Sequence, residues 1–174
     1  IGGDVTLTID KEKVKWNGNK SINYDISVEK KNTTGNVLAV DENGRRYTEF
    51  TVEVKSEKGT PDDITITDVF QGNGMKVDTS SFTYTITKNG NILNDSRYTA
   101  TTEVDANNSS RCNLTATLPK LEAGESCMLT YRYYISNTDE LSNGARWDAS
   151  NMVVGESTDK NTNEKVVDTS SSKV

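Results

Sequence analysis

Histidine is absent from the 174 residues of this sequence, and cysteine and proline occur only twice each. Histidine is the commonest general base and a frequent zinc ligand, so its absence removes the usual Ser and Cys triads and most zinc sites. Two cysteines alone cannot complete a structural zinc site. We therefore expect no metal, no cofactor and no enzyme with repeated turnover.

The sequence also lacks long apolar runs and an excess of basic charge. No stretch approaches the roughly 20 apolar residues of a membrane-spanning helix, so we expect no membrane insertion. The chain has 20 basic and 26 acidic residues, and the resulting net charge of −6 argues against nucleic acid as a partner. Because neither end shows a secretory signal or a cell-wall sorting motif, we expect the chain to be part of a longer protein.

Alternating apolar and polar residues fill much of the chain, with Thr as the usual polar partner. The clearest alternating segments are residues 5–9, 22–28, 50–54, 64–67, 82–86, 114–118 and 127–131. Turn signals such as Asn43-Gly44 and Asn89-Gly90 separate them. Apolar residues make up only 32% of the chain, which suits two thin sheets that each keep one face in water. The pattern predicts an all-β, antiparallel β-sandwich.

Composition divides the chain into three parts. We expect residues 22–157 to form the sandwich domain. Residues 1–21 are either an extra strand of this domain or a linker from a preceding module. Residues 158–174 are rich in Ser, Thr, Asn, Asp and Lys, and are expected to form a terminal strand that runs into a linker.

Three segments resemble, in this order, the repeat domains of Gram-positive pilins and adhesins, including the isopeptide-forming fimbrial domains. They are ISVEK at residues 26–30, the pair of strands at 47–54 and 64–70, and LPKLEAGES at 118–126, which leads into the strand at 127–133. A last strand near Asn151 completes the pattern. The resemblance implies an immunoglobulin-like sandwich in tandem arrays on the cell surface. About twenty residues separate Lys30 from Phe50, more than is usual in the family, which indicates an inserted hairpin around Asn43-Gly44.

By this resemblance, Lys30 is the amine of an intramolecular isopeptide bond, Asn151 is its electrophile and Asp68 is the assisting acid. Asp148 is the alternative electrophile, with loss of water in place of ammonia, and Lys31 and Lys11 are the fallback amines. An apolar environment lowers the pKa of a lysine, and the neutral amine can then attack. A protonated carboxyl group in the same environment can stabilise the tetrahedral intermediate.

Residue parity supports part of this assignment. Lys30 shares a strand face with Ile26 and Val28, and Asp68 shares one with Ile64 and Ile66. Both faces are apolar, which is an unusual place for an isolated charge. The alternative interpretation is that Lys30 ends a strand in solvent, Asp68 caps a turn and Asn151 is an ordinary loop residue.

Two cysteines allow two outcomes. Cys112 and Cys127 are on the apolar parity of strands that flank the 118–126 connection and could be neighbours. A disulfide between them is one expectation for an exported protein, and two small buried thiols are the other.

Other signals point to ligand binding. A sugar-stacking platform could be formed by Trp16, Trp147, Tyr131, Tyr133 and Tyr134. Tyr134 is expected to be the best exposed, because Tyr131 and Tyr133 share the inward parity of their strand. Packing of these aromatic side chains in the core is the alternative. Residues 41–44 offer oxygens to calcium but lack the full ligand spacing and are interpreted as a turn.

The leading hypothesis is a stalk or spacer module of an extracellular adhesin or pilus-like protein at the bacterial cell wall, with adjacent modules of the same chain as partners. The alternative is a module that binds carbohydrate or a host matrix protein.

Overall fold

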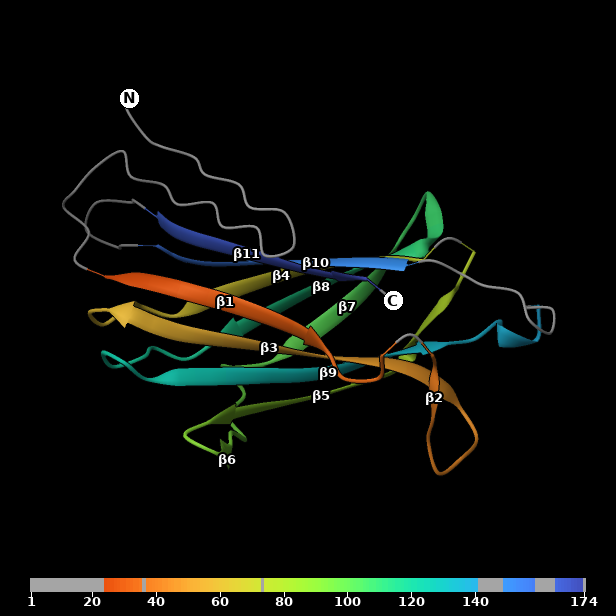
Figure 1. Ribbon diagram of the computed structural model, residues 1–174, viewed down its shortest axis with the longest axis horizontal. Coiled ribbons are helices and arrows are strands. Elements are labelled where there is room, and N and C mark those ends of the chain that lie inside the picture. The colour runs from red at the N-terminus through yellow and green to blue at the C-terminus, as the bar shows by residue number, and fades with distance from the viewer. Residues whose placement is uncertain (1–23, 36, 73, 141–148, 159–164, 174) are drawn as a thin grey trace.

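The computed structural model describes residues 24–35, 37–72, 74–140, 149–158 and 165–173. Antiparallel strands account for most of this part of the chain, with one short 3-10 turn at Thr138–Glu140 (Figure 1). The strands are β1 Asp25–Asn32, β2 Ala39–Val40, β3 Arg46–Lys58, β4 Ile64–Gly72, β5 Val77–Lys88, β6 Asn91–Ile92, β7 Ala100–Asp105, β8 Asn108–Leu118, β9 Ser126–Ile135, β10 Ala149–Thr158 and β11 Lys165–Lys173.

The strands form two sheets that pack face to face. One sheet has the order β1-β3-β9-β5-β6, with β2 also paired to β3, and the other has the order β11-β10-β4-β8-β7. The fold is therefore the all-β antiparallel sandwich that the alternation predicts, and the described residues contain no helix long and apolar enough to cross a membrane.

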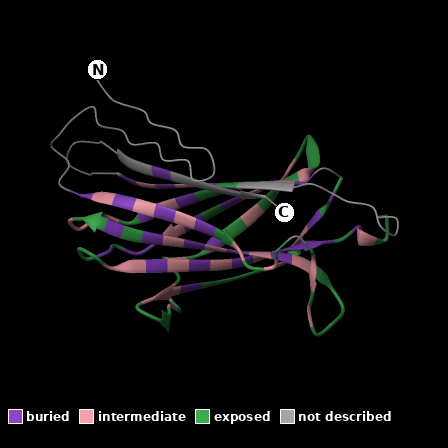
Figure 2. Cartoon of the chain, viewed as in Figure 1, coloured by how far each residue is buried: buried purple, intermediate pink, exposed green. Residues whose placement is uncertain are grey.

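Alternation of side chains explains why these segments are strands. Burial alternates with exposure along β1, β3, β4 and β9, which is visible as alternating bands in Figure 2. Successive side chains of a strand point to opposite faces of its sheet, so one face of each strand supplies the core. The buried residues of both sheets meet in one cluster that includes Phe50, Phe70, Leu114, Leu129 and Tyr133.

Two predicted turns form as their residues require. Asn89 and Gly90 both have positive φ, at 53° and 79°, and they join β5 to β6 in the conformation that favours Asn-Gly. The inserted hairpin around Asn43-Gly44 is confirmed: β2 pairs with β3, and Gly44 has a φ of 79°.

Five strands were absent from the alternating segments: β2, β6, β7, β10 and β11. Of these, β10 is the strand that the resemblance placed near Asn151, and β11 is the terminal strand expected within residues 158–174. β2 and β6 contain two residues each. β7 and β11 lie at the two edges of the five-stranded sheet, where a strand pairs on one side only and needs fewer apolar residues. The first 21 residues, for which an extra strand or a linker was expected, lie outside the described part of the chain.

β1 and β11 close one side of the sandwich. Each is the edge strand of its own sheet, and they lie beside each other in Figure 1. The carboxylate of Asp168 on β11 is fully buried and accepts a hydrogen bond from the backbone N–H of Val28 on β1, at 2.6 Å. This edge is where β1 brings Lys30 to the interior.

Candidate functional site

A lysine and an aspartate from opposite sheets meet inside the sandwich. The Nζ of Lys30 on β1 lies 2.6 Å from Oδ2 of Asp68 on β4, and both side chains are fully buried. The two faces that the parity analysis called apolar are confirmed, because Ile26, Val28 and the inward residues of β4 are also buried. The interpretations of Lys30 as a strand end in solvent and Asp68 as a turn cap are therefore wrong.

Two tyrosines of β9 complete a polar cluster around Asp68. The Tyr131 hydroxyl accepts a hydrogen bond from Lys30 Nζ and donates one to Asp68 Oδ2 at 2.7 Å. The Tyr133 hydroxyl donates to Asp68 Oδ1 at 2.5 Å. Both tyrosines are almost completely buried. Each carboxylate oxygen of Asp68 is thus engaged by at least one donor from the facing sheet.

Aromatic rings surround the ammonium group. Lys30 Nζ lies 4.3 Å from the ring centroid of Phe50 and 4.9 Å from that of Tyr131. The Phe70 ring packs on Tyr133 with centroids 4.9 Å apart. Rings of this kind attract a cation through their negative faces but supply little solvation to it. The site is therefore dry and of low dielectric constant, apart from the polar cluster itself.

Burial dominates the protonation of this cluster. Desolvation lowers the pKa of Lys30 from 10.5 to about 8, against the opposing charge and hydrogen bond of Asp68. Desolvation also raises the pKa of Tyr131 and of Tyr133 well above 10, and the neighbouring Asp68 adds to both shifts. The lysine is therefore close to losing its proton near neutral pH, while both phenols stay protonated.

Of the two candidate electrophiles, Asn151 and Asp148, the structure describes only the backbone of Asn151. Asn151 is on β10, where its backbone pairs with Phe70 of β4, two residues along from the Val153–Asp68 pair. The strand expected near Asn151 is thus the direct neighbour of the strand that carries Asp68. The side chain of Asn151, the whole of Asp148 and the fallback amine Lys11 lie outside the described residues.

Lys31, the other fallback amine, points away from the cluster. Its side chain is 70% exposed and lies 3.9 Å from the Glu29 carboxylate. The period of the strand explains this, because Lys31 follows the inward Lys30 by one residue and takes the opposite face.

Cys112 and Cys127 are free, buried thiols, not a disulfide. Their strands are not neighbours, since β8 and β9 belong to different sheets. Cys112 is paired with Phe70 of β4, whereas Cys127 is paired with Val54 of β3. Burial raises the pKa of Cys112 to about 12 and that of Cys127 to about 11.

The expectation that Tyr134 is exposed is wrong. It is 4% exposed, because the inserted hairpin covers it: the Arg45 guanidinium lies 4.5 Å from its ring centroid, and the Tyr47 ring lies 5.5 Å away. The Arg132 guanidinium in turn lies 4.0 Å from the Tyr47 ring. Tyr131 and Tyr133 are buried as well, as their inward parity predicted. The two tryptophans of the expected sugar platform, Trp16 and Trp147, lie outside the described residues.

Residues 41–44 form the turn that was expected in place of a calcium loop. Asp41 Oδ1 accepts hydrogen bonds from the backbone N–H groups of Asn43 and Arg45, each at 2.9 Å. The second oxygen accepts from Arg45 Nε at 3.2 Å. The described residues contain no cluster of His, Cys, Asp or Glu that could hold a metal ion.

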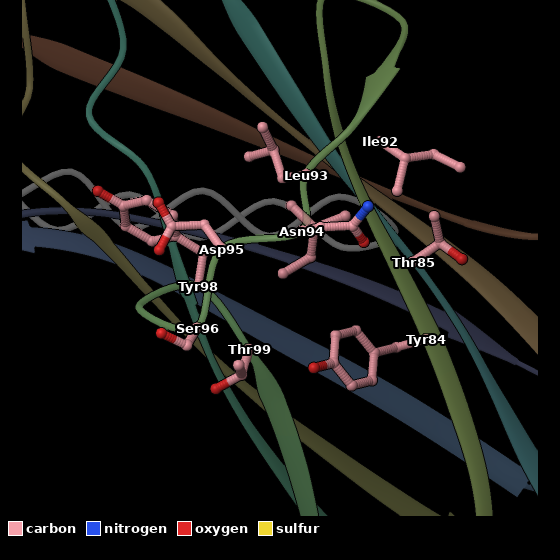
Figure 3. A pocket seen from close by; sticks show the side chains of 10 residues that line it. Tyr84, Thr85, Ile92, Leu93, Asn94, Asp95, Ser96, Tyr98 and Thr99 are labelled. Carbon is pink, nitrogen blue, oxygen red and sulfur yellow. The ribbon is translucent and has the colours of Figure 1, made fainter.

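A surface pocket of about 400 Å³ lies between β5 and the segment that follows β6. Tyr84, Ile92 and Tyr98 contribute to its wall, and Asp95 lies at the same wall, as Figure 3 shows. The Arg97 guanidinium holds Asp95 at 2.7 Å. This pocket was not expected from the sequence, because its residues converge only after the β5–β6 hairpin forms.

No protein-family model matches this chain, and no curated protein sequence matches it either. Solved structures with a similar fold include the full-length major pilin SpaD of Corynebacterium diphtheriae, at a TM-score of 0.52 and 13% identity over 85% of this chain. This chain spans 34% of that pilin.

Two further structures are similar. The collagen-binding domain of a Staphylococcus aureus adhesin has a TM-score of 0.46 and 16% identity, with 90% of this chain and 99% of the domain covered. AvmM, which catalyses macrocyclization in alchivemycin A biosynthesis, has a TM-score of 0.49 and 11% identity, with 86% and 88% covered. At such low sequence identities, structural similarity is evidence about the fold and not about the function. The chain therefore shares the β-sandwich fold of the SpaD pilin, as the resemblance to Gram-positive pilin domains predicted.

Proposed function

We propose that this chain is a structural stalk or spacer module of an extracellular Gram-positive pilus or adhesin, stapled by an isopeptide bond between Lys30 and Asn151. One observation carries the proposal: Lys30 and Asp68 are fully buried and 2.6 Å apart between the two sheets. Burying an ion pair costs several kcal/mol per ion, so hydrophobic residues of similar size would serve stability as well or better. A chemical role explains why the pair is there.

The chemistry follows from the protonation of the pair. A proton of the Lys30 ammonium passes to Asp68, which leaves a neutral amine and a carboxylic acid. The amine attacks Cγ of Asn151, and Asp68 hydrogen-bonds the developing oxyanion. The Cγ–Nδ2 bond of Asn151 breaks as a second proton of the former ammonium joins the departing nitrogen. Ammonia leaves, the third proton stays on the new amide nitrogen, and the reaction runs once per chain.

The fold supports the same assignment in a different way. β10 pairs with β4, so Asn151 and Asp68 belong to adjacent strands, while β1 brings Lys30 from the other sheet. A rigid sandwich that holds two reacting groups in place supplies the high effective molarity that such a reaction needs. The bond would then join the two sheets covalently.

Intact mass spectrometry of the purified, denatured and reduced chain tests the proposal. We expect a mass one ammonia below that of the sequence. Lys30→Met and Asp68→Ala should each restore the full sequence mass, and peptide mapping should locate the link between residues 30 and 151. Lys31→Met is the matched control, because it removes the exposed neighbouring amine and should leave the deficit unchanged.

Other outcomes discriminate among the alternatives. A deficit of one water would identify Asp148 or another acid as the electrophile. A deficit that disappears in Lys31→Met would move the amine to Lys31. A mass equal to that of the sequence would exclude the cross-link, and a ligand-binding module with its site at the Tyr84 pocket would become the better hypothesis.

A further inference from the structure

We propose that the Tyr131 hydroxyl relays the proton from Lys30 to Asp68, and that Tyr133 is a positioning residue that holds the Asp68 carboxyl group for this transfer. The proposal rests on the cross-linking function above and adds two residues to it. From the sequence, both tyrosines were expected either to pack in the core or to belong to a sugar-stacking platform.

The relay is built from contacts on both sides of one hydroxyl group. Tyr131 accepts from Lys30 Nζ and donates to Asp68 Oδ2 at 2.7 Å. A phenol is donor and acceptor at once, so it can take a proton from the ammonium as it gives its own to the carboxylate. No charged tyrosinate need form. The direct Lys30–Asp68 contact of 2.6 Å involves the same carboxylate oxygen, so the relay and the direct contact end at one atom.

Exclusion of water gives the relay its importance. The side chains of Lys30 and Asp68 have no exposed surface, and Tyr131 is 1% exposed. The proton that the amine must lose cannot pass to bulk solvent while the sandwich is closed. A protein hydroxyl in contact with both partners therefore takes the part that water plays in solution.

Tyr133 contacts the carboxyl group at its other oxygen. Its hydroxyl donates to Asp68 Oδ1 at 2.5 Å, and its ring is packed against Phe70. This bond fixes the rotation of the carboxyl group, so that Oδ2 faces Lys30 and Tyr131. Without it, rotation of the carboxyl group would move Oδ2 away from Lys30 and Tyr131.

The other described groups around Asp68 are poor proton carriers. The residues opposite Asp68 on the neighbouring strands are Leu114 on β8 and Val153 on β10. The Cys112 thiol lies near enough to feel the charge of Asp68, and burial together with that charge raises its pKa to about 12. Tyr131 and Tyr133, by contrast, each contact the carboxylate through a hydroxyl group, and burial raises the pKa of both, so each remains a protonated donor across the neutral range.

Time-resolved cross-linking of the full chain tests both roles. The chain is made by cell-free synthesis, samples are quenched in denaturant at intervals, and intact mass gives the fraction that has lost ammonia. The series is repeated at pH values below and above 8. Tyr131→Phe should slow the reaction about tenfold to hundredfold, the usual range for loss of one proton-transfer group. Tyr84→Phe removes an exposed hydroxyl outside the cluster and should match the wild type.

Tyr133→Phe should slow the cross-linking reaction severalfold, because its hydroxyl no longer holds Oδ1 of the Asp68 carboxyl group. Fluorotyrosine at position 133 keeps both the ring and the hydroxyl donor, so it should restore most of the rate. A role in packing alone would leave Tyr133→Phe at the wild-type rate, because the phenylalanine ring fills the same space.

A second variant guards against misfolding. Fluorotyrosine at position 131 keeps the ring and the hydroxyl but makes that hydroxyl more acidic, and it should alter the rate while the circular dichroism spectrum stays unchanged. Wild-type rates in both Tyr131 variants would overturn the relay, and a wild-type rate in Tyr133→Phe would overturn the positioning role. A wild-type chain that never loses ammonia would instead overturn the cross-linking function itself.

Discussion

Lys30 shows how one buried residue combines a cost to stability with a chemical capacity. Its side chain lies among aromatic rings and contacts the Asp68 carboxylate, and desolvation outweighs that attraction, so the pKa falls to about 8. The fall in the pKa of Lys30 from 10.5 to about 8 corresponds to a free-energy penalty of about 3 kcal/mol on the charged form relative to the neutral amine. The same burial that disfavours the ammonium group makes the amine available as a nucleophile.

This shift predicts how the stability of the uncross-linked chain depends on pH. In Asn151→Ala the amine stays free. Above pH 8 the folded form releases the Lys30 proton while the unfolded form still binds it, so the unfolded state holds more protons and the free energy of unfolding rises with pH. Urea denaturation from about pH 8 to just below pH 10 should show a gain of about 1–3 kcal/mol.

The control is Lys30→Met in the same Asn151→Ala background, in which this gain should disappear. The window stops near pH 10 because Tyr131 and Tyr133, whose pKa values are raised, act with the opposite sign once unfolded tyrosines ionise. A free energy of unfolding that is flat or falls with pH in Asn151→Ala would contradict the lowered pKa of Lys30.

At the scale of elements, the closed edge of the sandwich depends on a close approach of β1 to β10 and β11. Gly155 on β10 has no side chain to separate them: a Cβ atom there would lie 2.6 Å from Cγ2 of Val28. On β11 the residue paired with Gly155 is Asp168, which accepts the Val28 N–H. Glycine at this position lets a buried carboxylate reach the backbone of an edge strand that would otherwise lack a partner there.

Gly155→Ala should therefore destabilise the fold by about 1–3 kcal/mol, the usual cost of overpacking. Val28→Ala removes the clashing methyl groups, so in that background the same substitution should cost at least about 1 kcal/mol less. Thermal or urea denaturation of the two single variants and the double variant measures this coupling. Strictly additive effects would show that the contact with Val28 is not what requires glycine.

At the scale of the whole molecule, the proposed bond would join the first described strand to β10 and close a loop of about 120 residues. Closing a loop of that length stabilises a fold by about 4–5 kcal/mol if it acts as disulfides do in the chain-entropy model. It would also join the two sheets, so that force applied along the chain would pass through the bond and bypass most of the strands. This property suits a stalk.

Single-molecule stretching from both ends tests that consequence. Residues between 30 and 151 should not extend in the wild type, so unfolding should release roughly 400 Å less contour length than in Asn151→Ala. Lys31→Met should behave as the wild type does. Equal contour lengths in the wild type and Asn151→Ala would show that the chain bears load without a covalent link.

Local sequence determined most of the fold. The alternation in β1, β3, β4, β8 and β9 and the Asn-Gly turns are local properties, because strand period and turn conformation depend on residues within a few positions. Parity alone also placed Lys30 and Asp68 on buried faces. The signal that could have extended the site was present too, since Tyr131 and Tyr133 share an inward face, and a buried Asp and buried phenols need hydrogen-bond partners.

Tertiary structure decided what depends on contacts between distant segments. Only the packing of the two sheets brings the β9 hydroxyl groups to Asp68, and only the folded hairpin covers Tyr134. The separation of Cys112 from Cys127 follows from the crossing of the chain between sheets, which strand parity cannot reveal. Asp168, in a segment that resembles a linker, is buried because β11 meets β1. Strand period fixes which face a residue takes, whereas its partner across the core depends on how the sheets are ordered and packed.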